Sequence, residues 1–213
     1  MNNNEIAEKF EKVAILLRIS EDNPYHARAY DKAARIISGA GDSFEKYVKE
    51  GVDFAPKYRG IGEGISDHVK ELVNTGELEK LKKLEEKVPP TLIEVTKIRG
   101  VGPQTAKLVW EEKNITTVDQ LERAAKAGEL RDLKGLGKKT EENILKGIRD
   151  YRDWQDRFLL SDTDSIVETL TDYLKESKKV DRFEVAGSLR RRKETVGDLD
   201  VLAISEENTQ LMN

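Results

Sequence analysis

The sequence contains three copies of a short motif in which two glycines flank one aliphatic residue. The copies are Gly60-Ile61-Gly62, Gly100-Val101-Gly102 and Gly135-Leu136-Gly137, at separations of 40 and 35 residues. Apolar residues at helical spacing follow each copy, and further apolar residues precede it. Recurrence at such a period indicates one structural unit that is repeated along the chain. We therefore predict three units of helix, glycine hairpin and helix between residues 51 and 150.

Each hairpin is suited to contact a phosphate group. Glycine lets the backbone adopt positive φ values and approach another molecule without a β-carbon in the way. The amides at the start of the following helix have no intrahelical partner and favour an anion. Pro103 fits the first helical position after Gly102. We predict that the hairpins grip the DNA backbone with little preference for base sequence, the alternative being that they only join packed helices.

Basic residues beside the hairpins favour a nucleic-acid interface. The formal net charge is -4, which for the chain as a whole argues against nucleic acid. Locally, however, basic side chains cluster at the hairpins, and such clusters can neutralise the phosphates of one strand. The residues predicted to contact DNA are Gly60, Gly62, Gly100, Gly102, Gly135, Gly137, Lys57, Arg99, Lys107 and Lys138.

Three domains are expected along the chain. Residues 1–88 are predicted to form an N-terminal helical domain with the first hairpin, and Pro89-Pro90 marks its end. Residues 89–150 then form a second helical domain with the other two hairpins. Residues 151–213 begin a mixed region with one amphipathic helix and two segments of alternating pattern, 182–186 and 198–204. The predicted fold class is mainly α with a C-terminal α/β portion.

Composition removes several classes of protein. The chain has no cysteine and two histidines, which excludes disulfides and thiolate zinc sites and leaves little scope for histidine metal sites. No run approaches the roughly 18 apolar residues of a membrane span, and the N-terminus lacks the apolar stretch of a secretory signal. We expect a soluble, monomeric, intracellular protein without a membrane partner.

The segment 186–204 carries two carboxylates and a run of arginines. Asp198 and Asp200 are two residues apart in a predicted strand, so both side chains are expected on one face. Such a pair attracts a hard divalent cation, Mg²⁺ more often than Mn²⁺. Gly187 and Ser188 follow the preceding strand, where they permit close approach of a triphosphate and can donate to it. Each part alone is common on solvated surfaces, but together they indicate metal-assisted nucleotidyl transfer.

The order Gly-Ser, arginines, Gly-Asp-x-Asp resembles the palm of the nucleotidyltransferases, and in detail that of the family X DNA polymerases, the polymerase beta-like repair enzymes. The glycine units resemble the helix-hairpin-helix motif of DNA repair and replication proteins. The segment ETVGDLD and the presence of a third hairpin are most similar to what bacterial and archaeal members of the family have. These members often carry a C-terminal phosphoesterase domain. The resemblance implies helix-hairpin-helix domains followed by a partial palm, gap-filling synthesis in base excision repair, and gapped or nicked DNA and a dNTP as partners. It also implies a cytoplasmic, nucleoid-associated protein of a prokaryote.

The resemblance assigns roles to single residues. Asp198 and Asp200 would be catalytic and bind Mg²⁺ or Mn²⁺. The residues implied to contact the nucleotide are Gly187, Ser188, Arg191 and Gly197. The carbonyls implied to hold a Na⁺ or K⁺ ion at the second hairpin are those of Thr96, Ile98 and Val101. The side chains implied to line a pocket for a 5′-phosphate are His26, Tyr30 and Lys32.

The sequence departs from the family pattern in three respects, the first being Arg192, which stands where the family commonly has glycine. The family's site needs a third carboxylate from a later strand, and only 13 residues follow Asp200. We therefore expect an N-terminal fragment of a DNA polymerase, with an incomplete palm and no synthesis on its own. His68 stands where the family's 5′-deoxyribose-phosphate lyase has its lysine nucleophile, so lyase activity is not expected and His68 is expected to be a surface histidine.

Two other functions compete with this interpretation. The first is a non-catalytic DNA-binding module that recognises nicked or gapped DNA through its hairpins. The second is a template-independent nucleotidyltransferase, which would share the palm residues but would not explain three DNA-gripping hairpins.

Overall fold

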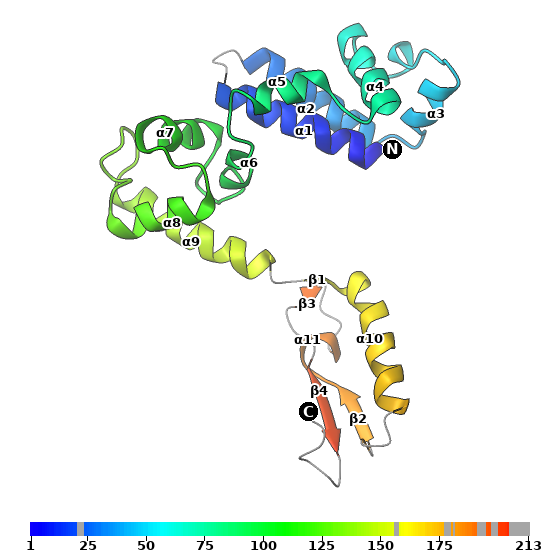
Figure 1. The fold of residues 1–213 in the computed structure, drawn as a ribbon, viewed down its shortest axis with the longest axis vertical. Coiled ribbons are helices and arrows are strands. Elements are labelled where there is room, and N and C mark those ends of the chain that lie inside the picture. The colour runs from blue at the N-terminus through cyan, green and yellow to red at the C-terminus, as the bar shows by residue number, and fades with distance from the viewer. Residues whose placement is uncertain are drawn as a thin grey trace. The chain divides into compact units, whose positions relative to one another are not determined.

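The chain was analysed as a computed structural model, which describes residues 1–20, 24–155, 158–176, 180, 182–190, 195–196 and 200–204. It divides into two compact units, Met1–Ile148 and Arg149–Asn213 (Figure 1). Helices make up the first unit, and the described strands all lie in the second. The predicted fold class, mainly α with a C-terminal α/β portion, is confirmed. Among the described residues, no helix is both long enough and apolar enough to cross a membrane.

In the first unit, each glycine hairpin lies between helices, in the order that the repeats predicted. They are α1 (Asn3–Ser20), α2 (Pro24–Ser38), α3 (Phe44–Lys49), α4 (Glu63–Thr75), α5 (Glu79–Glu85), α6 (Leu92–Val95), α7 (Pro103–Lys113), α8 (Val118–Ala127) and α9 (Lys138–Gln155), with a short 3₁₀ turn, η1 (Ala55–Lys57), ahead of the first hairpin. Helix α9 continues past Ile148, where the second unit begins.

Helix α1 is at the centre of the packing in the first unit. The apolar stripe expected from its periodicity is buried, since Ile6, Phe10, Val13 and Leu17 are all fully inaccessible. The helix packs most extensively against α2 and also contacts α4, α5, α6 and α7. Because α1 contacts helices on both sides of Pro89-Pro90, the segments before and after these prolines share one core. The domain boundary predicted at Pro89-Pro90 therefore stays a prediction.

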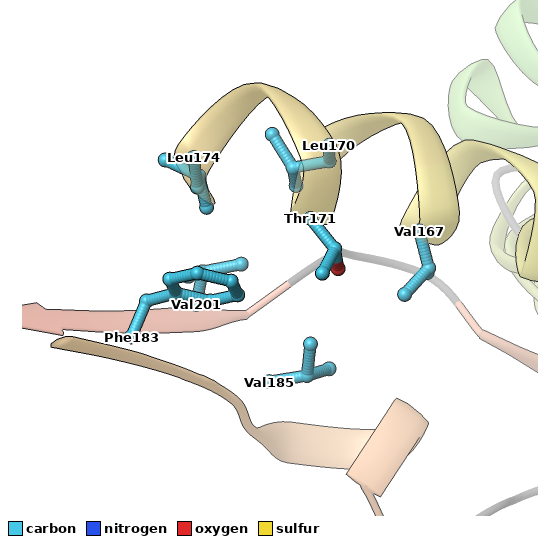
Figure 2. Close-up of a pocket in the computed structure, with 7 residues that line it drawn as sticks. All are labelled: Val167, Leu170, Thr171, Leu174, Phe183, Val185 and Val201. Atoms are coloured by element: carbon cyan, nitrogen blue, oxygen red, sulfur yellow. The ribbon is translucent and has the colours of Figure 1, made fainter. Parts of the chain in front are cut away.

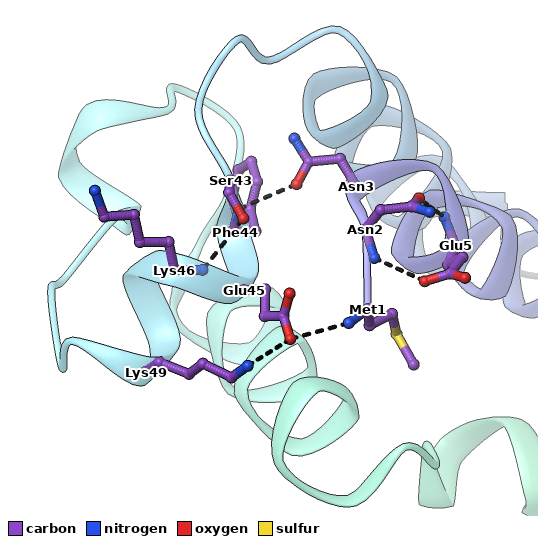
Figure 3. Close-up of polar contacts among 9 residues, drawn as sticks. All are labelled: Met1, Asn2, Asn3, Glu5, Ser43, Phe44, Glu45, Lys46 and Lys49. Atoms are coloured by element: carbon purple, nitrogen blue, oxygen red, sulfur yellow. Dashed lines mark hydrogen bonds and ion pairs between the residues drawn. The ribbon is translucent and has the colours of Figure 1, made fainter.

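The N-terminus of α1 is tied to α3 by polar contacts (Figure 3). The amino group of Met1 lies 3.1 Å from the carboxylate of Glu45. The amide of Phe44 donates to the side-chain oxygen of Asn3 at 3.0 Å. Ser43 caps α3, its side chain accepting a hydrogen bond from the amide of Lys46. These contacts hold the segment that leads into the first hairpin against the first helix.

After α9, the described residues of the second unit form short strands and further helices. They are β1 (Phe158–Leu159), α10 (Leu160–Glu176), β2 (Arg182–Val185), α11 (Gly187–Arg190), β3 (Thr195–Val196) and β4 (Val201–Ile204). Strand β2 pairs with β4 and β1 with β3, both antiparallel. The two segments of alternating pattern therefore form neighbouring strands.

One face of the β2–β4 pair is covered by α10. Phe183, Val185 and Val201 point toward this helix (Figure 2). The α10 side chains that meet them are Val167, Leu170, Thr171 and Leu174. On the other face Leu202 and Ile204 are exposed, at 66% and 63%. Within the described residues, this strand pair is packed on one side.

The second strand is shorter than the sequence predicted. It was expected to span residues 198–204, but β4 begins at Val201 and its last register pair joins Val185 to Val201. The amide of Ala186 still donates to the carbonyl of Asp200 at 2.8 Å. After Ala186 the chain turns into α11, so β2 does not continue past this point. The placement of Asp200 within a strand was therefore wrong.

Candidate nucleic-acid interface

The three hairpins have the same backbone geometry at their glycines. The first glycine of each pair has a positive φ, 121° at Gly60, 93° at Gly100 and 87° at Gly135. The second glycine of the first two hairpins is extended, with φ -85° at Gly62 and -87° at Gly102. Each of these two glycines is the N-cap of the following helix. The left-handed conformation is thus confined to the first glycine, where the turn requires it.

The aliphatic residue between the glycines anchors each hairpin. Ile61, Val101 and Leu136 are 4%, 2% and 6% exposed. In each copy, the amide of this residue donates to the carbonyl three residues earlier. These bonds join Ile61 to Tyr58 at 3.0 Å, Val101 to Ile98 at 2.9 Å and Leu136 to Leu133 at 2.9 Å. The three hairpins are therefore structurally equivalent turns.

The second glycines face open space. Within the described part of the chain, a β-carbon built at Gly62, Gly102 or Gly137 would meet no atom within 4 Å. At Gly62 and Gly102 the φ value is one that any residue adopts. Neither packing nor backbone conformation therefore requires glycine there. The missing side chain does keep the first amides of the following helix open to an approaching ligand.

The carbonyls predicted to hold a monovalent cation surround the second hairpin. The carbonyl of Ile98 accepts the amide of Val101 at 2.9 Å, which leaves one of its two lone pairs for another ligand. The hydroxyl of Thr96 donates to the carbonyl of Ile93 at 2.7 Å. The three residues follow one another around the turn before α7. Cation binding by them stays a prediction.

Lys57, predicted to contact DNA beside the first hairpin, is paired within the chain. Its Nζ lies 2.7 Å from the carboxylate of Asp42 and 2.6 Å from the hydroxyl of Tyr47. Tyr58 donates to the same Asp42 oxygen at 2.9 Å. The hydrogen bond from Lys57 lowers the pKa of Asp42 to about 2, and the same bond raises the pKa of Lys57. A DNA phosphate would have to compete with Asp42 for this lysine.

The residues predicted to line a 5′-phosphate pocket differ in environment. Tyr30 is buried, at 6% exposure, whereas His26 and Lys32 are exposed. The end of the Lys32 side chain lies against Gly60, so this lysine reaches the first hairpin. The hydroxyl of Tyr30 lies 3.0 Å from Nδ1 of His68, and the two rings stack. His68 is therefore half-buried and held by a partner, not the solvated surface histidine that was expected, because α4 packs against α2 here.

The other basic residues predicted to contact DNA belong to the second and third hairpins. Arg99 precedes Gly100 and is exposed. Lys107 is half-buried in α7 and has a partner within the chain. Lys138 is the first residue of α9 and is exposed. Arg99 and Lys138 therefore present positive charge beside these two hairpins.

A buried carboxylate that the sequence did not single out holds the third hairpin. Glu141 is 2% exposed and accepts hydrogen bonds from the guanidinium of Arg131, at 2.6 and 3.1 Å, and from the amides of Leu130 and Arg131. Burial raises the pKa of Glu141, but the bonds from Arg131 and Leu130 outweigh it, so the pKa lies below its ordinary value. Arg131 is thereby committed to the fold.

A contact between the second hairpin and α9 was also missed. A β-carbon at Gly147 would stand 2.6 Å from the carbonyl oxygen of Arg99. Beside this contact is an open hollow lined by Arg99, Gly100, Asn143, Lys146 and Gly147. No sequence motif pointed to Asn143 or Lys146 as functional residues. A glycine in the middle of a helical pattern was the signal that could have pointed to the contact.

The predicted palm residues are described only in part. Gly187 begins α11 with a φ of 61°, and the carboxylate of the exposed Asp200 lies against it. Asp198, Gly197, Arg191 and the side chain of Ser188 lie outside the described residues. Among the described residues, no three His, Cys, Asp or Glu side chains gather into a metal-binding group. A two-carboxylate metal site at Asp198 and Asp200 therefore stays a prediction.

Comparison with known proteins agrees with the hairpin geometry. Residues 1–78 match the family model of a helix-hairpin-helix domain, and residues 92–150 match that of a SAM-like helix-hairpin-helix tandem. All three glycine hairpins fall within these two segments. The class of protein defined by the fold is therefore a helix-hairpin-helix protein.

Individual relatives narrow the class. The chain is 27% identical over 211 residues to DNA polymerase/3′-5′ exonuclease PolX of Bacillus subtilis. The matched region makes up 99% of this chain and 36% of that protein. It is 30% identical over 203 residues to DNA polymerase lambda of Arabidopsis thaliana, covering 94% of this chain and 34% of the relative. DNA polymerase lambda of Rattus norvegicus is 28% identical over 197 residues. The chain is similar to DNA polymerases of family X along nearly its whole length, and it spans about a third of the length of these relatives.

Proposed function

We propose that this chain is the DNA-binding part of a family X DNA polymerase and that its three hairpins grip the backbone of gapped or nicked duplex DNA. The observation that carries the proposal is the open space at Gly62, Gly102 and Gly137. The fold would tolerate a side chain there, so the glycines serve the approach of another molecule. The ligand that fits is a phosphate group, because it can accept from the first amides of a helix and is attracted by its positive end.

This mode of binding ignores base sequence. Backbone amides and the exposed Arg99 and Lys138 can meet phosphate oxygens, and none of these contacts depends on base identity. Affinity should fall steeply as salt rises, since each neutralised phosphate releases condensed counterions.

The second unit supplies part of a catalytic palm in this proposal. Asp200, with Asp198 two residues before it, offers the hard oxygen ligands that Mg²⁺ prefers. A bound Mg²⁺ would polarise the phosphates of an incoming dNTP. Gly187 has no side chain, so the Asp200 carboxylate can lie directly against its backbone. We propose that this chain alone binds DNA but does not extend a primer, because the sequence identifies two metal-binding carboxylates, Asp198 and Asp200, of the three that the resemblance implies.

The alternative is a DNA-binding module with no catalytic role for Asp198 and Asp200. It makes the same prediction for DNA binding and a different one for metal binding. In that case, replacing Asp200 would change neither metal affinity nor nucleotide affinity.

The test combines a gel-shift assay and primer extension on a duplex with a one-nucleotide gap. Gly102→Leu should keep its helical circular dichroism and lose most of its DNA affinity. The matched control is Gly41→Leu, since Gly41 lies in a loop outside the hairpins and also has no atom within 4 Å of its β-carbon position. Equal DNA binding by the folded Gly102→Leu variant and the control would remove the hairpins from the mechanism. Primer extension abolished by Asp200→Ala would show that the palm is complete in this chain.

A further inference from the structure

The hollow beside the second hairpin is formed by parts of two different hairpin units. Arg99 and Gly100 come from the turn of the second hairpin, whereas Asn143, Lys146 and Gly147 come from α9, the second helix of the third unit. It is open to solvent, and its polar lining consists of a guanidinium, an ammonium, a carboxamide and backbone groups. Of the residues that the structure describes, no carboxylate lines it.

The place of α9 beside this turn is fixed by backbone contact. A β-carbon at Gly147 would stand 2.6 Å from the carbonyl oxygen and 3.1 Å from the amide nitrogen of Arg99. Gly147 itself is buried. Glycine inside a helix is unfavourable relative to alanine, so its presence here is explained by the close approach that it permits. One turn of α9 is thereby held against the hairpin, and Lys146 and Asn143 are carried with it.

The polar side chains around the hollow have no partner among the described residues, unlike two other basic residues near the hairpins. Lys57 pairs with Asp42, and Arg131 pairs with Glu141. Within the described part of the chain, by contrast, no hydrogen bond or ion pair engages Arg99, Asn143 or Lys146. Two positive charges without counterions, at an opening without a β-carbon at Gly100, attract an anion strongly.

We propose that this hollow binds one phosphodiester group of the DNA backbone, so that the second hairpin's grip is completed by Lys146 and Asn143 of the third unit. The guanidinium of Arg99 and the ammonium of Lys146 neutralise the phosphate, and the Asn143 amide donates to one of its oxygens. The inference rests on the proposed DNA binding and adds residues to it. It makes the second and third hairpins one binding surface, since α9 serves both.

The test is fluorescence anisotropy with a gapped duplex, using the whole 213-residue chain over a series of KCl concentrations. Lys146→Ala should lower the slope of log K against log [KCl] by about 0.9, the value for one lost phosphate contact. Between about 50 and 200 mM KCl its affinity should therefore fall roughly 3.5-fold less than that of the wild type. Asn143→Ala should weaken binding without changing the slope. Both side chains are exposed, so neither change should disturb the fold.

The control is Lys80→Ala, which removes a half-buried lysine from α5, outside all three hairpins. It should leave both the affinity and the slope unchanged. If the wild type binds DNA and Gly102→Leu weakens it, but Lys146→Ala behaves like Lys80→Ala, the hollow is not a phosphate site and the proposed function stands. If the wild type does not bind gapped DNA at all, the proposed function and this inference both fall.

Discussion

The carboxylate of Asp200 lies against the α-carbon of Gly187, in the space that a β-carbon on residue 187 would occupy. The amide of Ala186 donates to the carbonyl of Asp200 at 2.8 Å and fixes the two segments beside each other. Gly187 also has a φ of 61°, which glycine adopts without strain. A residue predicted to contact nucleotide and a residue predicted to bind metal are thus in direct contact.

Gly187→Ala should therefore impair metal binding through Asp200. The new methyl group would displace the carboxylate, and the left-handed backbone would cost about 1–2 kcal/mol. We expect Mn²⁺ affinity, measured by electron paramagnetic resonance, to fall about as far as in Asp200→Asn. The double variant should be no weaker than Asp200→Asn alone, because both changes act on one carboxylate. Wild-type Mn²⁺ affinity in Gly187→Ala would contradict the proposed metal site.

Gly147→Ala should destabilise the first unit by about 1–3 kcal/mol, because the methyl group would collide with the backbone of Arg99. This loss should exceed the gain in helix propensity that alanine brings. Gly64→Ala is the control: Gly64 lies in α4, and a β-carbon there would meet nothing within 4 Å. It should be neutral or stabilise the chain by up to about 1 kcal/mol. Urea unfolding curves would distinguish the two, and equal stability of both variants would disprove the close contact.

Glu141→Gln should lower the free energy of unfolding by about 1–3 kcal/mol, because the buried side chain would lose its charge and some of its four hydrogen bonds. Glu142→Gln, an exposed neighbour on α9, should change stability by no more than about 0.5 kcal/mol. The pKa of Glu141 is lowered in the fold, so its contribution is present above the ordinary carboxyl pKa and is lost as pH falls through the folded value. Acid unfolding of Glu141→Gln should accordingly lack this component. The measurement is a set of denaturant unfolding curves at neutral and acid pH. A Glu141→Gln variant as stable as Glu142→Gln at both pH values would contradict the stabilising role of Glu141.

Tyr58 should ionise far above an ordinary tyrosine. Burial and the hydrogen bond to Asp42 raise its pKa to about 12, against about 10 for a free phenol. The stability that this provides is fully present below about pH 10 and is lost as pH rises through about 12. Ultraviolet titration of the wild type against Tyr58→Phe should isolate this group.

Asp42→Asn provides the comparison for that titration. It removes the charged acceptor and should lower the pKa of Tyr58, but not to its ordinary value, since burial comes first among the causes. A Tyr58 that titrates in the wild type at the pH of a free phenol would show that neither its burial nor this hydrogen bond persists in solution.

Local patterns predicted the hairpin units well. The spacing of Ile6, Phe10 and Leu17 gave a helix whose apolar stripe is buried. The glycine pairs gave turns that end at the N-caps of α4 and α7. These features depend on residues within one turn or one helix, so the printed order of residues contains the information. The start of β4 was misjudged because a strand ends where its partner ends, and β2 gives way to α11 after Ala186.

The sequence by itself determined the helical repeats, the position of each glycine turn and the likeness to family X polymerases, since all of these are patterns along the chain. Only the tertiary structure decided which charges are available. Lys57 was predicted to contact DNA but is engaged by Asp42, whereas Lys146 lies beside Arg99 without an ion pair to any described residue. The physical reason is that a charge is neutralised by whatever lies within a few ångströms of it, and folding brings together residues that are distant in sequence.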